Sequence, residues 1–226
     1  MISAWWGDLR RRALLSKAPE GALKRYLGTP WPAPHLDYRA VDYLALDFET
    51  TGLKPKRDAV VSFGYLPLGG SRIRLSGANY SLVQTSQPVE QSATIHGLFD
   101  DAVAAGLESK VALDTVLTAL TGRVLLVHYA PIELSFLNAL CRYHYGLPFV
   151  ARVVDTLALA RRRQARRAEP LDAEALRLYT LRERYDLPRY KSHNALADAL
   201  ATAELFLALA AERAGDRALT LERLLY

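Results

Sequence analysis

The succession of strand and helix patterns is the feature of this sequence that most restricts its fold. Four strand-like segments, rich in apolar and β-branched residues and punctuated by glycines, follow one another at residues 43–49, 59–68, 72–76 and 80–84. Consecutive strands with short connections predict an antiparallel ribbon.

Beyond the ribbon, helix and strand patterns alternate. Residues 110–120 and 131–143 have the spacing of helices, residues 123–127 and a short segment near Val153 are typical of strands, and helical patterns continue to the end. A ribbon followed by such units predicts an α/β fold, in which a mixed β-sheet with antiparallel and parallel strands is flanked by helices. The 226 residues suffice for one domain with room for a small appendage.

Residues 1–40 differ from the rest and predict an N-terminal helical appendage. Two short helical patterns, at residues 6–16 and 19–27, precede the segment 29–34, whose three prolines favour a stiff, extended connector. We therefore divide the chain into this appendage and a main domain at residues 41–226. The sequence leaves open whether the appendage covers the core, joins a partner or mediates self-association.

Composition excludes several classes of protein. Half of the residues are apolar and 23% are charged, the balance of a folded protein, and no apolar run has the length of a signal-peptide core or a membrane span. The single cysteine, Cys141, excludes an internal disulfide and a zinc site built from cysteines, so a reducing, cytoplasmic location is expected. The net charge of +5 favours a polyanionic partner only weakly, because many basic proteins bind no nucleic acid.

Two carboxylates lie two residues apart at the end of the first strand pattern. Because alternate residues of a strand face the same side, Asp47 and Glu49 project together, away from the apolar residues between and before them. Two acids on one surface repel each other unless a cation lies between them, and divalent cations such as Mg²⁺ prefer carboxylate oxygens. The alternative is a solvent-facing strand with two ordinary acids. The flexible turn 50–53 favours the ligand site, because its backbone N–H groups can meet a phosphate or a terminal hydroxyl.

A third carboxylate interrupts the apolar stripe of a helix pattern. Pro131 suits the first turn of a helix, and at helical spacing Glu133 aligns with Phe136 and Leu137. A carboxylate on an apolar stripe needs a partner. The alternative is that Glu133 only complements the helix dipole, as acids in first turns often do.

A histidine and an aspartate open the last long helix pattern. His193 and Asp198 are five positions apart, which does not place both on one helix face, so His193 is expected at or before the helix start. Asp198 aligns with Leu205 and Leu209 on an apolar stripe, where an unpaired carboxylate would cost several kcal/mol. A metal ion or a hydrogen-bond partner is therefore expected for Asp198. A histidine in such a place is, by itself, usually a polar cap.

Three segments together resemble the motifs of the DnaQ-like 3′→5′ exonucleases, in the DEDDh-type subclass and in the order of that superfamily. The superfamily includes the proofreading epsilon subunits of bacterial DNA polymerase III and several exoribonucleases. The resemblance covers about residues 42–212 and implies an RNase H-like exonuclease domain. The three segments are Asp47-Phe48-Glu49-Thr50-Thr51-Gly52-Leu53, the stretch from His128 to Leu137, and the stretch from Ser192 to Ala203.

The resemblance implies a hydrolase site with two divalent ions, Mg²⁺ or Mn²⁺. By this resemblance Asp47 bridges the two ions, Glu49 and Asp198 complete the first, and the second is supported by Glu133. His193 is implied as the general base that takes a proton from the attacking water, because imidazole titrates near neutral pH. The expected holders of the terminal nucleotide are Thr50, Thr51, Gly52 and Leu53.

The chain departs from the second motif of the family at two positions. The family usually has Asp where this chain has Glu133, and Asn where it has Tyr129. The longer side chain of Glu133 can still ligate after a small shift or act through a water. The departure therefore bears on the second ion, the metal preference and the rate.

Two shorter segments are also similar to parts of the family, although both suit ordinary loop or cap chemistry. His96, in Ile95-His96-Gly97-Leu98, is a candidate substrate contact, and Asp155-Thr156-Leu157 resembles a turn after the last core strand. The arginine-rich run 161–167 is a candidate for holding the backbone of the incoming strand. A solvated loop or helix end is an equal interpretation of that run.

Together the motifs predict a metal-dependent 3′→5′ exonuclease that releases nucleoside 5′-monophosphates from single-stranded nucleic acid. DNA is weakly favoured over RNA, since no residue identifies a contact to the 2′-hydroxyl. The alternatives are an exoribonuclease on short RNA and a non-catalytic module that binds nucleic acid or docks on a polymerase. The expected partners are single-stranded DNA or RNA with a free 3′ end, then a DNA polymerase or another replication or repair protein, and no membrane.

Overall fold

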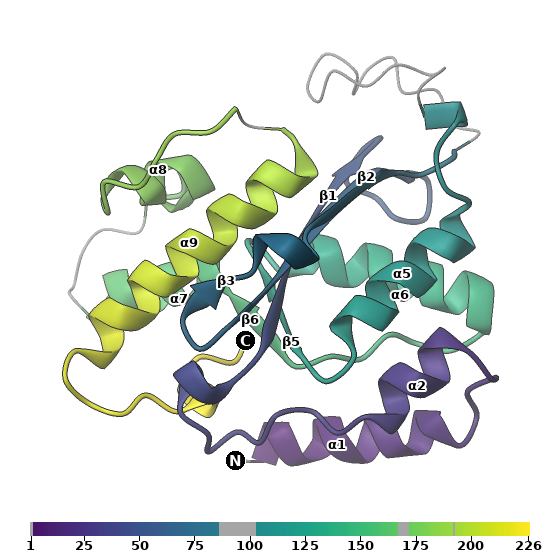
Figure 1. Ribbon diagram of the computed structural model, residues 1–226, viewed down its shortest axis with the longest axis horizontal. Coiled ribbons are helices and arrows are strands. Elements are labelled where there is room, and N and C mark those ends of the chain that lie inside the picture. Colours follow the sequence, from purple (N-terminus) through teal and green to yellow (C-terminus); the bar gives the residue numbers. More distant parts are fainter. Residues whose placement is uncertain (1, 86–102, 167–171, 192) are drawn as a thin grey trace.

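The computed structural model describes residues 2–85, 103–166, 172–191 and 193–226, with side chains from residue 6 onward. These residues form a six-stranded sheet in the order β3-β2-β1-β5-β6, and β4 also pairs with β2 (Figure 1). The strands are β1 (Tyr43–Thr50), β2 (Val60–Gly69), β3 (Arg72–Ile73), β4 (Asn79–Leu82), β5 (Val124–Val127) and β6 (Val153–Asp155).

The sheet is mixed, as the sequence predicts. β1 is antiparallel to β2, whereas β1, β5 and β6 run parallel to one another. The carboxyl ends of these three strands therefore meet at one edge of the sheet, where ligand sites of open α/β sheets lie. The strands expected at residues 43–49, 59–68 and 123–127 are confirmed to within one residue at each end.

The strand expected at residues 72–76 is shorter than predicted. β3 ends at Ile73, and Leu75–Gly77 forms a turn of 3-10 helix. The N–H of Arg74 donates to the carbonyl of Pro67 on β2 at 2.9 Å, but Pro67 has no N–H to return the second bond of an antiparallel pair. The ladder between β2 and β3 therefore stops after two residue pairs.

Helices cover both faces of the sheet (Figure 1). On one side lie α5 (Ser109–Leu120) and α6 (Pro131–Tyr145), and on the other lie α7 (Thr156–Arg166), α8 (Leu178–Glu183) and α9 (Ala195–Ala214). Alternate residues of β1 divide the two cores, because Leu44 packs with α5 and α6 whereas Tyr43 and Ala45 pack with α9. No helix in the described ranges has the length and apolar character needed to cross a bilayer.

A glycine on β2 allows α9 to begin against the sheet. Gly64 is the partner of Asp47 in the pairing of β1 with β2. A Cβ atom at Gly64 would lie 2.1 Å from the backbone nitrogen of Leu196, in the first turn of α9. Only glycine permits so close an approach of two backbones. The start of α9 is thereby brought beside the carboxylates of β1.

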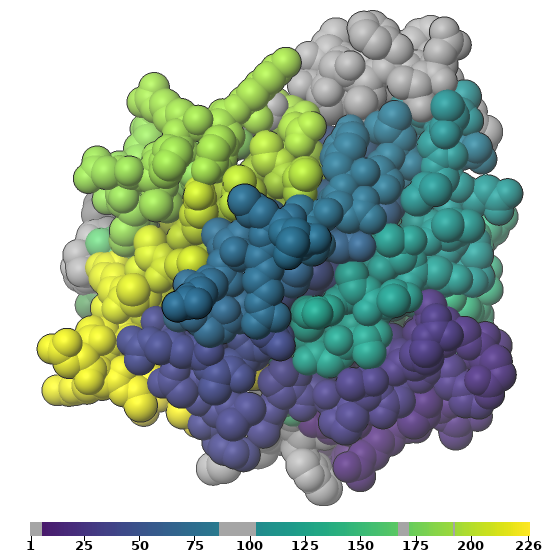
Figure 2. Space-filling model, in the orientation of Figure 1, coloured from purple at the N-terminus to yellow at the C-terminus, as the bar shows by residue number. Residues whose placement is uncertain are grey.

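The N-terminal helices α1 (Ile2–Leu15) and α2 (Ala22–Gly28) belong to the same packed body. α2 packs against α5 and α1 packs against α2, and Figure 2 shows their surface continuous with that of α5. Tyr26 is fully buried, and its hydroxyl donates to the carbonyl of Val150 at 2.7 Å. The N-terminal residues thus cover part of the core, while the division of the chain near residue 40 stays a prediction.

Candidate active site

Three carboxylates converge where β1 ends and α9 begins. Asp47 and Glu49 come from β1, and Asp198 comes from the first turn of α9. One oxygen of each carboxylate lies within 4.8 Å of an oxygen of the other two. We call these three residues the acidic cluster. It lies at the edge of the sheet where the parallel strands have their carboxyl ends.

Neighbouring residues hold both carboxylate oxygens of the buried Asp198. The hydroxyl of Tyr179, on α8, donates to Oδ1, and the backbone N–H of His193 donates to Oδ2 at 2.9 Å. The partner expected for Asp198 on its apolar stripe is therefore present. Its position is fixed from two sides before any ligand is considered.

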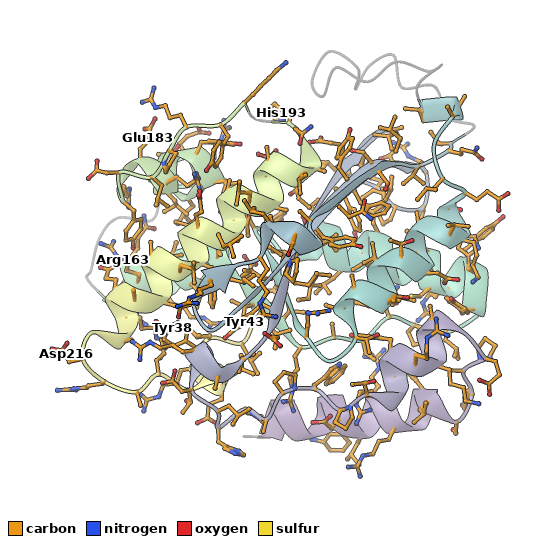
Figure 3. All side chains as sticks on the ribbon, in the orientation of Figure 1. Tyr38, Tyr43, Arg163, Glu183, His193 and Asp216 are labelled. Atoms are coloured by element: carbon orange, nitrogen blue, oxygen red, sulfur yellow. The ribbon has the colours of Figure 1, made fainter. Side chains whose placement is uncertain are left out.

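His193 precedes α9, as its spacing from Asp198 predicts. Its backbone lies in the left-handed region, with a φ of 64°. The next residue, Asn194, caps the helix, because its side chain accepts from the N–H of Ala197 at 3.0 Å. The side chain of His193 is exposed beside the start of α9 (Figure 3). The polar cap of α9 is thus Asn194, and the imidazole of His193 is left accessible.

Glu133 lies in the first turn of α6 and is only 4% exposed. Its Oε2 atom is buried and has no hydrogen-bond partner in the part of the chain that the structure describes. Glu133 is not part of the acidic cluster, yet its charge helps to raise the pKa of Asp47. A buried carboxylate oxygen without a partner costs free energy, and complementing a helix dipole does not remove that cost.

Asp155, at the end of β6, organises the backbone around Glu133. Its Oδ1 accepts from the N–H of Tyr129 at 3.0 Å and of Leu157 at 2.9 Å, and its Oδ2 accepts from Ala130 at 3.0 Å. The same carboxylate therefore caps α7 and fixes the loop that leads into α6. Tyr129 has a φ of 79°, a region that Asn enters more readily than Tyr. The segment that starts at Asp155 is therefore a helix cap, which is the ordinary cap chemistry that the sequence also allows.

Crowding of negative charge perturbs the whole acidic site. Desolvation, with the charge of Glu133 as the next cause, raises the pKa of Asp47 well above its ordinary value. Burial raises the pKa of Glu49 to about 7 and that of Glu133 to about 8. No lysine or arginine in the described ranges forms an ion pair with these acids or with Asp198. Such a donor set suits a hard divalent cation, which would favour the ionised carboxylates.

The turn after β1 lies directly beside Glu49. The hydroxyl of Thr50 donates to the carbonyl of Gly52 at 2.8 Å, and Thr51 accepts from the N–H of Ala59 at 2.9 Å. Leu53 is 72% exposed, which is unusual for a leucine next to a charged site. These four residues form a short, internally bonded loop with an apolar side chain at its tip. Their contact with a substrate stays a prediction.

Two further predictions concern His96 and the arginine-rich run. His96 and the residues around it lie outside the described ranges. Of the arginine-rich run, Arg161 to Arg166 lie on the second half of α7, and Arg167 is not described. Since α7 starts at Thr156, next to Asp155, the run points away from the acidic cluster.

Sequence patterns did not reveal two residues that shape the site. Tyr179 precedes Asp198 by 19 positions and reaches it only because α8 packs on α9. Gly64 was recognised only as punctuation, although it sets the distance between α9 and the sheet. A glycine inside an otherwise continuous strand pattern is a usable signal of close backbone approach. Tyr179 has no local signal.

Comparison with known families and proteins gives one consistent result. The model of an exonuclease family, RNase_T, matches residues 44–206. The DNA polymerase III PolC-type protein of Thermotoga maritima is 29% identical over 170 residues, which are 73% of this chain and 12% of that protein. The DNA polymerase III epsilon subunit of Treponema pallidum is 29% identical over 175 residues, 77% of this chain and 79% of that subunit. The chain therefore spans only a small part of the PolC-type polymerases that it matches.

Solved structures share the fold at low sequence identity. Exonuclease X, solved in complex with 5′-overhanging duplex DNA, has a TM-score of 0.60 and 20% identity, over 80% of this chain and 98% of that one. Exonuclease I of E. coli, solved with a dT13 oligonucleotide, has a TM-score of 0.63 and 16% identity, over 78% of this chain and 43% of that one. The RNase H-like fold is thereby confirmed. The chain belongs to the RNase_T family of exonucleases, and its resemblance to the DnaQ-like 3′→5′ exonucleases is confirmed at the level of the family.

Proposed function

We propose that this chain hydrolyses single-stranded nucleic acid from its 3′ end and releases nucleoside 5′-monophosphates. The observation that carries the proposal is the acidic cluster, in which three carboxylates from β1 and α9 approach one another within 4.8 Å. Burial and, after it, the neighbouring negative charges raise the pKa values of Asp47 and Glu49, so the ionised cluster is unfavourable by itself. A cation-dependent reaction at this edge of the sheet accounts for it.

We assign Asp47, Glu49 and Asp198 as direct ligands of Mg²⁺ or Mn²⁺, with Glu133 supporting a second ion. A pair of such ions supplies charge neutralisation and activation of water in phosphodiester hydrolysis. The partnerless Oε2 of Glu133 supports this assignment, because it leaves a buried ligand atom available. Tyr179 and the N–H of His193 keep Asp198 in place for the same task.

The remaining residues of the site act on water and on the terminal nucleotide. His193, with its exposed imidazole beside Asp198, takes the proton from the attacking water as general base. The loop Thr50–Leu53 holds the terminal nucleotide, with Leu53 against the base and the loop backbone near the 3′-hydroxyl. His96 is an additional candidate for contact with the substrate.

DNA is the substrate that the comparisons favour, and a DNA polymerase is the protein partner. The relatives include epsilon subunits of DNA polymerase III, and exonuclease I was solved with a DNA oligonucleotide. A reducing, cytoplasmic setting fits both the single cysteine and such a partner. An exoribonuclease acting on short RNA is the alternative within the enzyme class.

The test is degradation of 5′-labelled single-stranded DNA and RNA of equal sequence, with Mg²⁺, with Mn²⁺ and with chelator. The expected result is a ladder that shortens from the 3′ end, requires the metal and favours DNA. Asp198→Asn should abolish the ladder together with the metal-induced rise in melting temperature. His193→Ala should lower kcat while leaving that rise intact, because His193 is not a ligand in the proposal.

A second candidate function is a non-catalytic module that binds nucleic acid. Glu133 favours it, because a longer carboxylate stands where the family usually has Asp. Binding of the labelled strands without digestion under any metal, by a folded protein, would establish this module and refute the exonuclease. Recovery of digestion in Glu133→Asp would then identify the second motif as the cause.

A further inference from the structure

A second charged site lies at the opposite end of α9 from the acidic cluster. The second half of α7, the last turns of α9 and the residues near Leu224 enclose a cavity of about 390 Å³. The described residues that line it are Arg163, Arg166, Arg213, Glu212 and three leucines. We call this cavity the arginine pocket. Figure 3 labels Arg163 along the part of α9 that is remote from His193.

Among the described residues that line the arginine pocket, three are arginines and one, Glu212, is an acid. Glu212 accepts from Nε of Arg163 at 2.9 Å and also from the hydroxyl of Tyr185. Arg213 has a buried Nη1 atom with no hydrogen-bond partner among the described residues. Desolvation lowers the pKa of Arg213, and the charges of Arg166, Arg162 and Arg223 lower it further.

Complementing helix dipoles does not explain this arrangement. Basic residues are favourable near the C-termini of helices such as α7 and α9, and exposed side chains are sufficient for that effect. A buried guanidinium nitrogen without an acceptor is costly, and several arginines around it increase the cost. An anion with several oxygens removes both penalties, and a phosphate matches the fork of donors that arginine presents.

The arginine pocket is too far from the acidic cluster to act on the same phosphate. Arg213 follows Asp198 by fifteen residues on one continuous helix, which corresponds to about 22 Å along its axis. At the rise of 3.4 Å per phosphate of a stacked strand, that distance is about seven nucleotides. A ligand that occupies both sites must therefore be a polymer.

We propose that the arginine pocket binds a backbone phosphate of the same strand whose 3′ end enters the acidic cluster. The inference rests on the proposed function and adds to it a second contact several nucleotides upstream of the cleaved bond. Such a contact is independent of sequence and weakened by salt. It makes affinity depend on the length of the strand, because a strand too short to span the two sites gains nothing from the pocket.

The test measures binding without cleavage, in an Asp47→Asn background, for a trinucleotide and for a strand of about fifteen nucleotides. Arg213→Gln is expected to weaken binding of the long strand about fivefold at low salt. It should also reduce the slope of log affinity against log salt by about 0.7, the value for one lost phosphate contact. Binding of the trinucleotide should stay unchanged.

Arg142→Gln is the matched control, because it removes the same charge from a residue on the other side of the sheet. Arg142 is exposed on α6. Equal effects of Arg142→Gln and Arg213→Gln on the long strand would overturn the proposal. Inorganic phosphate is the second probe: if it stabilises the wild-type protein against melting but the long strand binds Arg213→Gln normally, the pocket serves free phosphate and the proposal fails. Because no cleavage is measured, an inactive acidic cluster does not alter these outcomes.

Folding is controlled separately. Arg213→Gln removes a cation that neighbouring arginines crowd, so its melting temperature should equal or exceed that of the wild type. Arg166→Gln is a second variant, since Arg166 lines the pocket but is exposed and its replacement leaves the core intact. It should reproduce the length-dependent loss of affinity.

Discussion

Like charges gather at the two ends of α9, whereas the middle of the helix holds a matched ion pair. At the start Asp198 lies with Asp47 and Glu49, and at the end Arg213 lies among other arginines. In the middle Glu204 binds Arg182 of α8 at 2.7 Å. One helix therefore carries clustered acids at its start, an ion pair in its middle and clustered arginines at its end.

The ion pair in the middle is bonded within the protein through both terminal nitrogens of Arg182, and Nε of Arg182 is left without a partner among the described residues. Arg182 is 1% exposed, and its guanidinium donates to the carbonyls of Ala201 and Pro188, each at 2.6 Å, as well as to Glu204. It also lies over the ring of Tyr190. These bonds tie α8 and the segment after it to α9, and so hold Tyr179 beside Asp198. Charge that is satisfied in this way supports the fold, while crowded like charge at the ends indicates ligands of the opposite sign.

Asp47→Asn is expected to have the largest effect of the variants considered. It should lower activity and raise the stability of the metal-free protein. Activity should fall by at least about 10³-fold, equivalent to roughly 4 kcal/mol, because Asp47 is a proposed ligand of the metal that would activate the attacking water. The metal-free protein should become more stable at pH 8, by about 1 kcal/mol after screening by solvent, because one of the crowded charges is gone. Single-turnover hydrolysis and thermal melting measure the two parts.

Asp42→Asn is the control for this substitution, since Asp42 is exposed just before the same strand and pairs with Arg74 at 3.3 Å. It should leave both activity and stability nearly unchanged. A loss of stability in metal-free Asp47→Asn would mean that the carboxylate is paired within the protein. The acidic end of α9 would then resemble its middle, where the charges are paired.

Arg182→Gln should cost about 3 kcal/mol of unfolding free energy, because it breaks a buried ion pair with Glu204 and removes the bonds from the guanidinium to two carbonyls. Arg213→Gln, the same change near the end of α9, should stay within about 0.5 kcal/mol of the wild type. Urea denaturation of both variants gives the two values. Similar losses in both would show that Arg213 is as much a structural residue as Arg182.

Periodicity in the sequence was sufficient to find the elements and the acids of the site. Alternation on β1 placed Asp47 and Glu49 on one face, and an apolar stripe made Asp198 conspicuous, because a carboxylate on such a stripe requires a partner. These signals are local, since each depends on residues within one strand or one helix. The fold followed from the order of the same elements.

Features that depend on the meeting of distant elements were not visible in the sequence. The bond from Tyr179 to Asp198 requires α8 to lie on α9, and the arginine pocket requires the ends of α7 and α9 to meet. The arginine-rich run on α7 was noticed, but nothing local connects it with Arg213. The overlong strand at residues 72–76 has a similar origin, because its limit is set by Pro67 on the partner strand.

Tyr179→Phe should produce an intermediate effect that is confined to the acidic end. It removes the donor to Oδ1 of Asp198 and leaves the bond from His193 to Oδ2 in place. Loss of a residue that orients a metal ligand typically weakens metal affinity by about tenfold. Calorimetric titration with Mn²⁺ in the absence of nucleic acid measures this change directly.

Tyr190→Phe is the matched control for Tyr179→Phe. Tyr190 lies in the segment that follows α8, the helix that carries Tyr179. Its hydroxyl donates to Glu204, in the middle of α9, at 2.9 Å. It should lower stability slightly and leave the affinity for Mn²⁺ unchanged. A loss of metal affinity in both variants would assign the effect to movement of the segment rather than to the orientation of Asp198.

The smallest expected effect is the pH dependence of stability in the metal-free protein. Burial raises the pKa of Glu49 to about 7, above the ordinary value of about 4.3 that applies to the unfolded chain. A raised pKa means that the folded protein holds the proton more tightly, so this contribution to stability is fully present below pH 4 and is lost as the pH rises to 7. Because Glu49 is only partly buried, screening by solvent limits the loss to roughly 1 kcal/mol.

Melting of metal-free wild type and Glu49→Gln between pH 5 and pH 8 isolates this contribution, with exposed Glu222→Gln as the control. The stability of Glu49→Gln should fall less over that range than that of the wild type, and saturating Mg²⁺ should flatten the wild-type curve, because a cation favours the ionised carboxylate. If Mg²⁺ stabilised the wild type equally at both pH values, proton and cation would not compete at Glu49. Glu49 would then not be a cation ligand, and at this residue the acidic end of α9 would lack the preparation for a ligand of opposite charge that we propose for the arginine pocket.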